Sequence, residues 1–201
     1  MIYQGKELTT GILKTPVSSS LYVSKVQIEG DGQADLTVHG GPDKAICVYP
    51  EEHYAFWEKL LGKKLERGTF GENLTLRGVR EHEIGIGDIL AIGEVIVQVS
   101  QPRQPCHKLA KRLDWPEAVL RVQESGLTGY YFRVLKEGYI APESEISRIA
   151  SDEGRVTVAF ANKLRYEDKF NREGIQRLLA VAALSGSWRQ TFEKRLAELN
   201  V

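Results

Sequence analysis

The chain has 201 residues, of which 42% are hydrophobic and 27% charged, an ordinary composition for a globular protein. Its 27 Lys and Arg residues balance its 27 Asp and Glu residues, which argues against nucleic acid polymers or anionic membrane surfaces as partners. No apolar run is long enough to cross a bilayer, and the N-terminus lacks the apolar core of a signal peptide. We therefore expect a cytoplasmic protein. Its two cysteines are too few for a disulfide scaffold.

The sequence up to about residue 149 predicts a mainly β architecture. Short runs of β-branched and aromatic residues alternate there with glycine-bearing turns, as in a barrel or sandwich. The predicted strands cover residues 11–15, 22–28, 34–39, 45–49, 73–76, 88–92, 94–100, 129–135 and 145–150. Two predicted helices interrupt them, over residues 50–61 and 116–125, and Gly126 ends the second.

The hydrophobic period changes to that of helices after residue 152. Thr157 is placed to cap a first short helix. Apolar residues then recur at helical spacing from Ile175, and either Ser185 or Ser187 can cap a third helix with one apolar face. Each apolar stripe needs a partner surface, and docking on the β region or a homodimer would supply one.

These patterns together predict a mainly β fold with α elements. We expect a β-barrel with peripheral helices over residues 1–152 and a small three-helix extension over residues 153–201.

Cys106 lies where an apolar strand gives way to a predicted helix. Pro102 and Pro105 stop the strand, and Pro105 suits the first position of a helix. Cys106 would then lie in the first helical turn, where the helix dipole and unpaired N–H groups favour an anion. Three cationic side chains flank it in the sequence: Arg103, His107 and Lys108. This setting favours a thiolate and predicts a reactive or metal-binding cysteine.

Cys47 has a different sequence setting. It lies inside the apolar predicted strand 45–49, which is typical of a small buried apolar residue. A buried apolar role is the default for a lone cysteine. For Cys106 it competes with the role of a reactive or metal-binding thiolate.

Two glycine-bearing turns are further candidates for ligand contact. In the segment 39–44, Gly40 and Gly41 would let the backbone approach a ligand or bind an anion, with a phosphate contact from Lys44 and a hydrogen bond from His39. In the segment 70–74, the amide of Asn73 both donates and accepts, which suits the edge of a purine or pterin. Each segment also fits an ordinary turn or bulge.

Lys14 and Arg133 complete the set of cations near these segments. With Arg103 and Lys108 they would form one anion pocket if the fold brings them together, whereas each taken singly fits a solvated surface. The histidines and cysteines show no metal-binding spacing. A metal would therefore have to arrive within a cofactor and be held by a single thiolate.

In order and spacing, these elements resemble a MOSC domain, a family named for the C-terminal domain of molybdenum cofactor sulfurase. The segments that carry the resemblance are residues 30–35, 39–45, 70–74, 87–88, 98–109 and 128–135. The segments around Cys106 and around Gly40 and Gly41 are the most specific. The C-terminal helices resemble the three-helix extension of the bacterial YiiM-like subgroup.

The resemblance implies a barrel that binds the molybdenum cofactor (Mo-molybdopterin), with Cys106 as the catalytic thiolate ligand to molybdenum. It implies reduction of small N-hydroxylated compounds such as 6-N-hydroxylaminopurine. Arg103 and Lys14 are the candidates for contact with the pterin phosphate. The residues expected to line the cofactor or substrate side are His39, Gly40, Gly41, Lys44 and Asn73.

Electrons would come from a separate flavoprotein or ferredoxin-type protein, because two cysteines cannot hold an iron–sulfur cluster alone. Two other functions remain open at this point. The chain could be a carrier that hands cofactor or sulfur to another protein, with a persulfide on Cys106. It could also be a structural β domain without a cofactor, in which Cys106 happens to lie at a helix start.

Overall fold

The computed structural model describes residues 2–3, 6–7, 11–32 and 40–199. Its centre is a six-stranded sheet, curled into a half-barrel, with the strand order β10-β6-β7-β8-β4-β5. The strands are β4 (Ile46–Pro50), β5 (Leu74–Leu76), β6 (Ile89–Ile92), β7 (Val95–Pro102), β8 (Tyr130–Lys136) and β10 (Ile146–Ala150). Neighbouring strands are antiparallel except for β4 and β5. Two small antiparallel pairs join β3 (Leu21–Val23) to β9 (Gly138–Ile140) and β1 (Ile2–Tyr3) to β2 (Lys6–Glu7).

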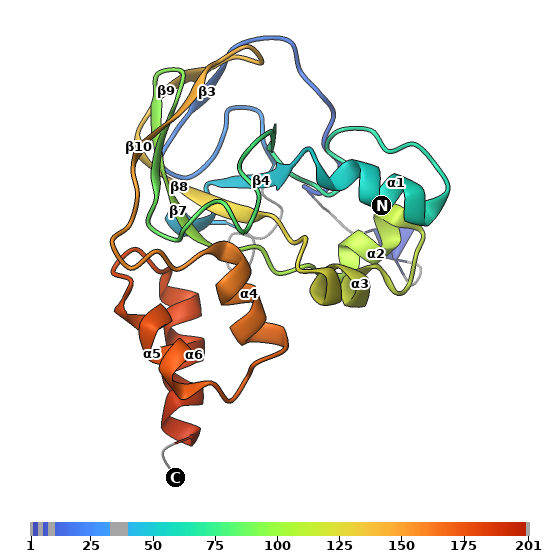
Figure 1. Ribbon diagram of the computed structural model, residues 1–201. Helices are drawn as coiled ribbons and strands as arrows, with labels where there is room; N and C mark the ends of the chain where they lie inside the picture. Colours follow the sequence, from blue (N-terminus) through green and yellow to red (C-terminus); the bar gives the residue numbers. More distant parts are fainter. Residues whose placement is uncertain (1, 4–5, 8–10, 33–39, 200–201) are drawn as a thin grey trace.

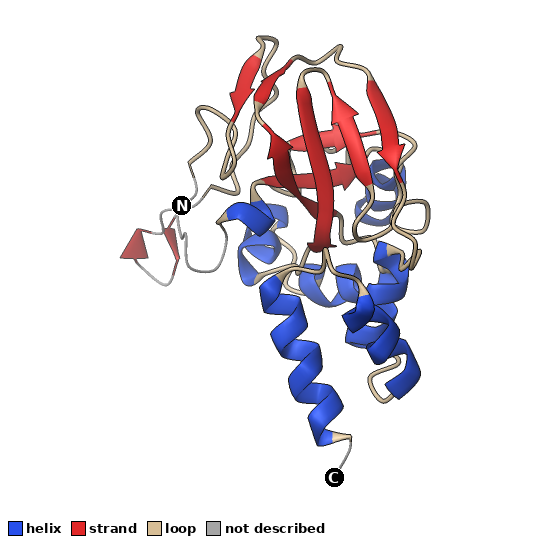
Figure 2. Ribbon diagram, turned by 90° about the vertical axis from the view of Figure 1, so that its left-hand side faces the viewer, coloured by secondary structure: helices blue, strands red, loops and turns tan. Residues whose placement is uncertain are grey.

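Helices gather in two groups around this sheet (Figure 1). The first group lies to one side and contains α1 (His53–Leu61), α2 (His107–Leu113) and α3 (Ala118–Ser125). The second lies beneath the sheet and contains α4 (Val158–Tyr166), α5 (Arg172–Ala180) and α6 (Gly186–Glu198). Figure 2 shows the large sheet above these helices. The predicted β-sheet core with peripheral helices and three C-terminal helices is thus confirmed, in a mixed α/β fold whose sheet forms a half-barrel.

Strand alternation divides the sheet into an apolar face and a more polar face. In β8, Tyr130, Phe132 and Val134 are buried in the main core, while the intervening Tyr131 is half-buried. Cys47 of β4 is the register partner of Tyr131. Because successive side chains of a strand point to opposite faces, Cys47 and Tyr131 lie together on the face away from the main core.

The C-terminal helices share the main core of the sheet. Ile175 of α5 and Phe192 of α6 belong to the same buried cluster as Val97 and Phe132 of the sheet. The apolar stripes therefore cover the sheet, as the docking interpretation requires, and a homodimer stays a prediction. Within the described residues, no helix has the length and apolarity needed to span a membrane.

Phe192 makes this shared core testable. It is fully buried and stacks on Trp188 with ring centroids 5.5 Å apart. We expect Phe192→Ala to lower the free energy of unfolding by about 3–5 kcal/mol, because it removes apolar contacts and leaves a cavity. Phe170→Ala is the matched control: Phe170 is 81% exposed, and its loss should change the free energy by less than about 0.5 kcal/mol. Urea unfolding of both variants measures the difference, and equal effects would contradict a shared core.

Several sequence predictions for the helices are confirmed in detail. Thr157 caps α4, and its side-chain oxygen accepts a hydrogen bond from the backbone N–H of Phe160. Of the two candidate caps of the last helix, Ser185 is the one used, since its hydroxyl accepts from the N–H of Trp188. Both caps satisfy N–H groups that a helix start leaves without an internal partner.

The N-terminal strand predictions need correction. Residues 11–15 form no strand. Ile12 is buried instead in a second hydrophobic cluster that includes Tyr49 and Phe70, close to the turn at Gly71, where a Cβ would stand 2.5 Å from Cγ1 of Ile12. The strand predicted over 22–28 is broken by a turn at Ser24, whose hydroxyl accepts from the N–H of Gln27 at 3.2 Å.

Two further strands remain, one predicted and one observed. The predicted strand 34–39 lies outside the described residues. The sequence prediction missed β9 because this strand is only three residues long and pairs with the equally short β3.

Candidate functional site

Cys106 lies at the junction of β7 and α2. The strand runs two residues past its predicted end, through Pro102, which pairs with Tyr130. Cys106 is half-buried and forms the N-cap of α2, with an extended backbone at φ −120° and ψ 166°. The first helical residue is His107, so the prediction that Pro105 opens the helix is wrong. An N-cap residue has non-helical dihedral angles, which is why the helix begins only after Cys106.

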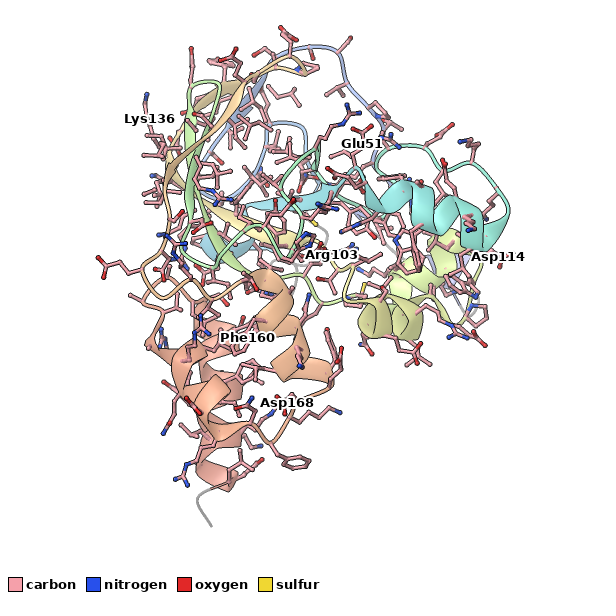
Figure 3. The ribbon with its side chains drawn as sticks, in the orientation of Figure 1. Glu51, Arg103, Asp114, Lys136, Phe160 and Asp168 are labelled. Carbon is pink, nitrogen blue, oxygen red and sulfur yellow. The ribbon has the colours of Figure 1, made fainter. Side chains whose placement is uncertain are left out.

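Arg103 is a buried cation beside Cys106. The residue is 6% exposed, and Figure 3 shows it near the centre of the molecule. Burial by itself would lower the pKa of Arg103, but interactions with Cys47, Tyr131 and Cys106 raise it, so the guanidinium stays charged. Its Nη1 atom is buried without a hydrogen-bond partner. Because buried charged donors are almost always paired in folded proteins, this nitrogen points to an anionic ligand.

Asn73 joins two neighbouring segments at this place. Its Oδ1 accepts from the N–H of Cys47 at 2.8 Å, and its own N–H donates to the Cys47 carbonyl at 2.8 Å. Its Nδ2 donates to Oδ2 of Asp31 at 2.6 Å. The amide that was predicted to read a purine or pterin edge is thus engaged within the protein. Direct contact between Asn73 and a ligand stays a prediction.

Lys14 reaches the same place from the N-terminal segment. Its ammonium group pairs with Oδ1 of Asp31, which also accepts from Asn73 through its other oxygen. Burial lowers the pKa of Lys14, and interactions with Cys47 and Glu72 oppose this effect. We call the whole group the Cys106 cluster, and its members are Lys14, Asp31, Cys47, Asn73, Arg103, Cys106 and Tyr131.

Arg133, the other cation of the predicted anion pocket, is engaged by partners within the protein. Its Nε and Nη2 atoms contact Oδ1 of Asp43 at 3.1 and 2.7 Å, and its Nη1 contacts Oε1 of Gln98 at 3.3 Å. These partners hold its guanidinium within the protein. On α2, His107 is exposed and Lys108 half-buried, whereas Arg103 interacts electrostatically with Cys106.

The glycine turn before β4 is held by the C-terminal extension. Gly41 has a positive φ of 91°, and a Cβ there would meet no atom within 4 Å. Asp43 accepts from Oγ of Ser100 through its carbonyl at 2.5 Å, and from the N–H of Gly186 through its carboxylate at 3.2 Å. Burial lowers the pKa of Lys44, which is half-buried. Ligand contacts of Gly40, Gly41 and Lys44 stay predictions, and His39 lies outside the described residues.

Sequence reasoning missed three members of the cluster. Cys47 is buried at 6% exposure, as predicted, but it faces Arg103 rather than the main core. Tyr131 shares its face, and strand alternation could have indicated both. Asp31 lies in a glycine turn, and no local pattern indicates that its carboxylate pairs with Lys14.

The two cysteines should differ sharply in reactivity. Burial raises the pKa of the Cys47 thiol, whereas Cys106 is half-exposed. We expect iodoacetamide to alkylate Cys106 at least about tenfold faster than Cys47 in the native protein, because reagent access and thiolate formation both limit the rate. Peptide mass spectrometry over a time course measures the two rates. Cys106→Ala should remove the fast phase, and a fast phase that persists in this variant would contradict the assignment.

Comparison with known families gives two matches that together span most of the chain. Residues 35–147 match the MOSC domain, and residues 156–199 match the YiiM-like 3-alpha helix domain. The first match covers the curled sheet up to the start of β10, together with the Cys106 cluster from Cys47 onward. The second covers the helices beneath the sheet.

Individual proteins agree with these matches. The chain is 51% identical to the uncharacterized protein YflK of Bacillus subtilis (96% of this chain, 87% of that one) and 38% identical to the protein YiiM of Escherichia coli (92% and 84%). A protein of Gibberella moniliformis named "Reductase" is 35% identical over 71% of this chain, which spans 26% of that protein.

The crystal structure of YiiM from Geobacillus stearothermophilus superposes with a TM-score of 0.85 at 41% identity, covering 94% of this chain and 91% of that one. YiiM from Escherichia coli superposes with a TM-score of 0.83 at 32% identity, covering 92% and 89%. Sequence, fold and C-terminal helices lead to one conclusion: the chain belongs to the MOSC domain family and, within it, to the YiiM-like proteins.

Proposed function

We propose that this protein is a molybdenum-cofactor-dependent reductase of N-hydroxylated compounds, such as 6-N-hydroxylaminopurine. The observation that carries the proposal is the buried guanidinium of Arg103, which keeps an unpartnered donor next to the half-exposed Cys106. Membership of the MOSC family, which is associated with molybdenum cofactor binding, supports it. So does the relative named "Reductase".

The Cys106 cluster fits this cofactor chemically. A thiolate is a soft ligand of the kind that suits a metal such as molybdenum. Among the described residues, no group of three His, Cys, Asp or Glu side chains could hold a metal ion by itself. Cys106 would therefore be the protein ligand to a metal whose other ligands belong to the cofactor. The free donor of Arg103 and the ammonium of Lys14 would hold the phosphate of the pterin.

The reaction converts N–OH to N–H, consumes two electrons and two protons, and releases water. When bound, the cofactor supplies the two-electron redox chemistry, while the protein positions and tunes it. The Tyr131 hydroxyl is protonated at neutral pH, and burial raises its pKa further, so it can donate a hydrogen bond within the cluster. A separate flavoprotein or ferredoxin-type protein would deliver the electrons.

Metal and pterin analysis tests the proposal. The wild-type chain and Cys106→Ala are purified side by side from a host that makes the molybdenum cofactor. Molybdenum and pterin close to one per chain in the wild type, with the metal lost in the variant, would support the proposal. No molybdenum in either protein would overturn it. A stable Cys106 persulfide without turnover would favour the alternative function, a carrier of cofactor or sulfur.

A further inference from the structure

A pocket with a volume of about 460 Å³ lies next to the helices, and its lining is separate from the Cys106 cluster. It lies between the start of α1, the end of α3 and one face of α4. Its lining includes Glu52, His53, Glu81, Gly126, Asn162 and Lys163. No member of the Cys106 cluster lines it. Its volume falls within the range of small-molecule binding sites.

A buried acid–imidazole pair forms part of the pocket wall. Nε2 of His53 lies 2.6 Å from Oε2 of Glu81, and the two residues are 5% and 3% exposed. The other carboxylate oxygen of Glu81 accepts from the N–H of Gly129 at 2.7 Å. Both oxygens are therefore engaged, and the pair gives this wall a fixed geometry.

Two other oxygens in the lining residues have no partner. Asn162 is 3% exposed, and its Nδ2 donates to Oγ1 of Thr128 at 2.8 Å, but its Oδ1 is buried without a donor. Glu52 accepts from the N–H of Gly78 through Oε1 at 2.7 Å, whereas its Oε2 is buried without a donor. Buried acceptors are nearly always satisfied in folded proteins. A ligand with N–H donors would give these two oxygens the hydrogen-bond partners that they lack.

The charges of the pocket favour a positive ligand. Glu52, Glu81 and Glu167 contribute carboxylates to its lining. The guanidinium of Arg80 is occupied by Glu83, with contacts of 3.1 and 2.8 Å. Lys163 is exposed and lies at the rim. The lining thus offers unpaired acceptors and carboxylates.

We propose that this pocket is a second ligand site and that it binds a small organic cation carrying N–H donors, a primary amine or a guanidinium. The cation would donate to Oδ1 of Asn162 and Oε2 of Glu52. Hydrogen bonds between charged groups are stronger than neutral ones, so Glu52 is the residue on which affinity depends most. The site does not depend on the proposed reductase function, because none of its residues belongs to the Cys106 cluster.

The test is a titration of the full ¹⁵N-labelled chain with agmatine, which carries a guanidinium at one end and a primary amine at the other. We expect saturable shifts of the Asn162 side-chain amide and the Gly126 backbone amide, with a dissociation constant of about 1 mM or below. n-Butylamine and methylguanidine, titrated separately, show which end binds. Succinate, a dianion of similar length, should produce no saturable shift.

Glu52→Gln keeps an acceptor for the Gly78 N–H and removes the charge, so it should weaken agmatine binding by at least about tenfold. Glu66→Gln is the matched control, because Glu66 is exposed and outside the pocket lining. If Glu52→Gln does not fold, Lys163→Gln replaces it and should tighten binding about twofold or more by removing a repulsive charge. No saturable shift with agmatine, equal shifts with succinate, or unchanged affinity in the tested pocket variant would each overturn the proposal.

Discussion

Cys106→Ser is expected to abolish reduction of 6-N-hydroxylaminopurine, with a loss of at least about 10³-fold, or more than 4 kcal/mol of transition-state stabilisation. Serine preserves the size and polarity of the side chain, but its hydroxyl stays protonated at neutral pH and is a hard ligand. Cys106 is half-buried at the end of a loop and caps α2 without a side-chain hydrogen bond. The change should therefore alter the free energy of unfolding by less than about 1 kcal/mol.

Steady-state turnover with an artificial electron donor and urea unfolding of the same preparation measure both effects. Cys47→Ala serves as the comparison, since it removes the chain's other thiol and leaves the Cys106 ligand in place. This variant should still contain molybdenum. Turnover by Cys106→Ser at more than a tenth of the wild-type rate would refute the ligand role of Cys106.

Arg103→Met should separate stability from cofactor binding. The guanidinium is buried, charged and incompletely hydrogen-bonded, an arrangement that destabilises the empty protein. Methionine has a similar length and no charge. We expect the cofactor-free variant to unfold at the same or a higher urea concentration than the cofactor-free wild type. Its affinity for the cofactor should fall by about 10- to 100-fold, because a hydrogen bond to a charged group is worth about 1.5–3 kcal/mol.

Arg133→Met is the matched control for this experiment. Arg133 contacts Asp43 and Gln98, so its loss leaves partners unpaired and should lower stability while the cofactor is retained. Urea unfolding of protein from a cofactor-deficient host, and pterin content after dialysis of protein from a competent host, measure the two properties. Strong destabilisation of Arg103→Met together with full pterin retention would show that Arg103 has a structural role.

Local sequence patterns predicted much of the fold because they depend on neighbouring residues. The caps at Thr157 and Ser185 each satisfy an N–H group three residues ahead, and the strands with long β-branched runs were found within one or two residues. The strand prediction over 11–15 was wrong because Ile12 packs against a turn more than fifty residues away. The same holds for β9, whose pairing partner lies in the N-terminal part of the chain.

The candidate site was predicted only in part for a related reason. Cys106 and Arg103 share one short segment, so their proximity follows from the sequence. Lys14, Asp31 and Cys47 come from separate segments, and only the folded chain shows that Asp31 joins Lys14 to Asn73. Arg133 is an arginine like Arg103 and was predicted to join the same anion pocket, yet its guanidinium is engaged by Asp43. Ion pairs between distant segments decide which charges are neutralised, and a local sequence pattern does not predict these pairs.

The backbone of Gly129 has a consequence for how this fold tolerates substitutions. Its N–H donates to Glu81 and its carbonyl accepts from the N–H of Arg103, so one residue joins the wall of the second pocket to the Cys106 cluster. Its φ is +71°, and a Cβ would stand 2.3 Å from the carbonyl oxygen of Val48. A side chain at position 129 would thus disturb both sites at once. Glycine would then be retained at this position because its backbone hydrogen-bonds to both sites, although the residue takes no part in the chemistry.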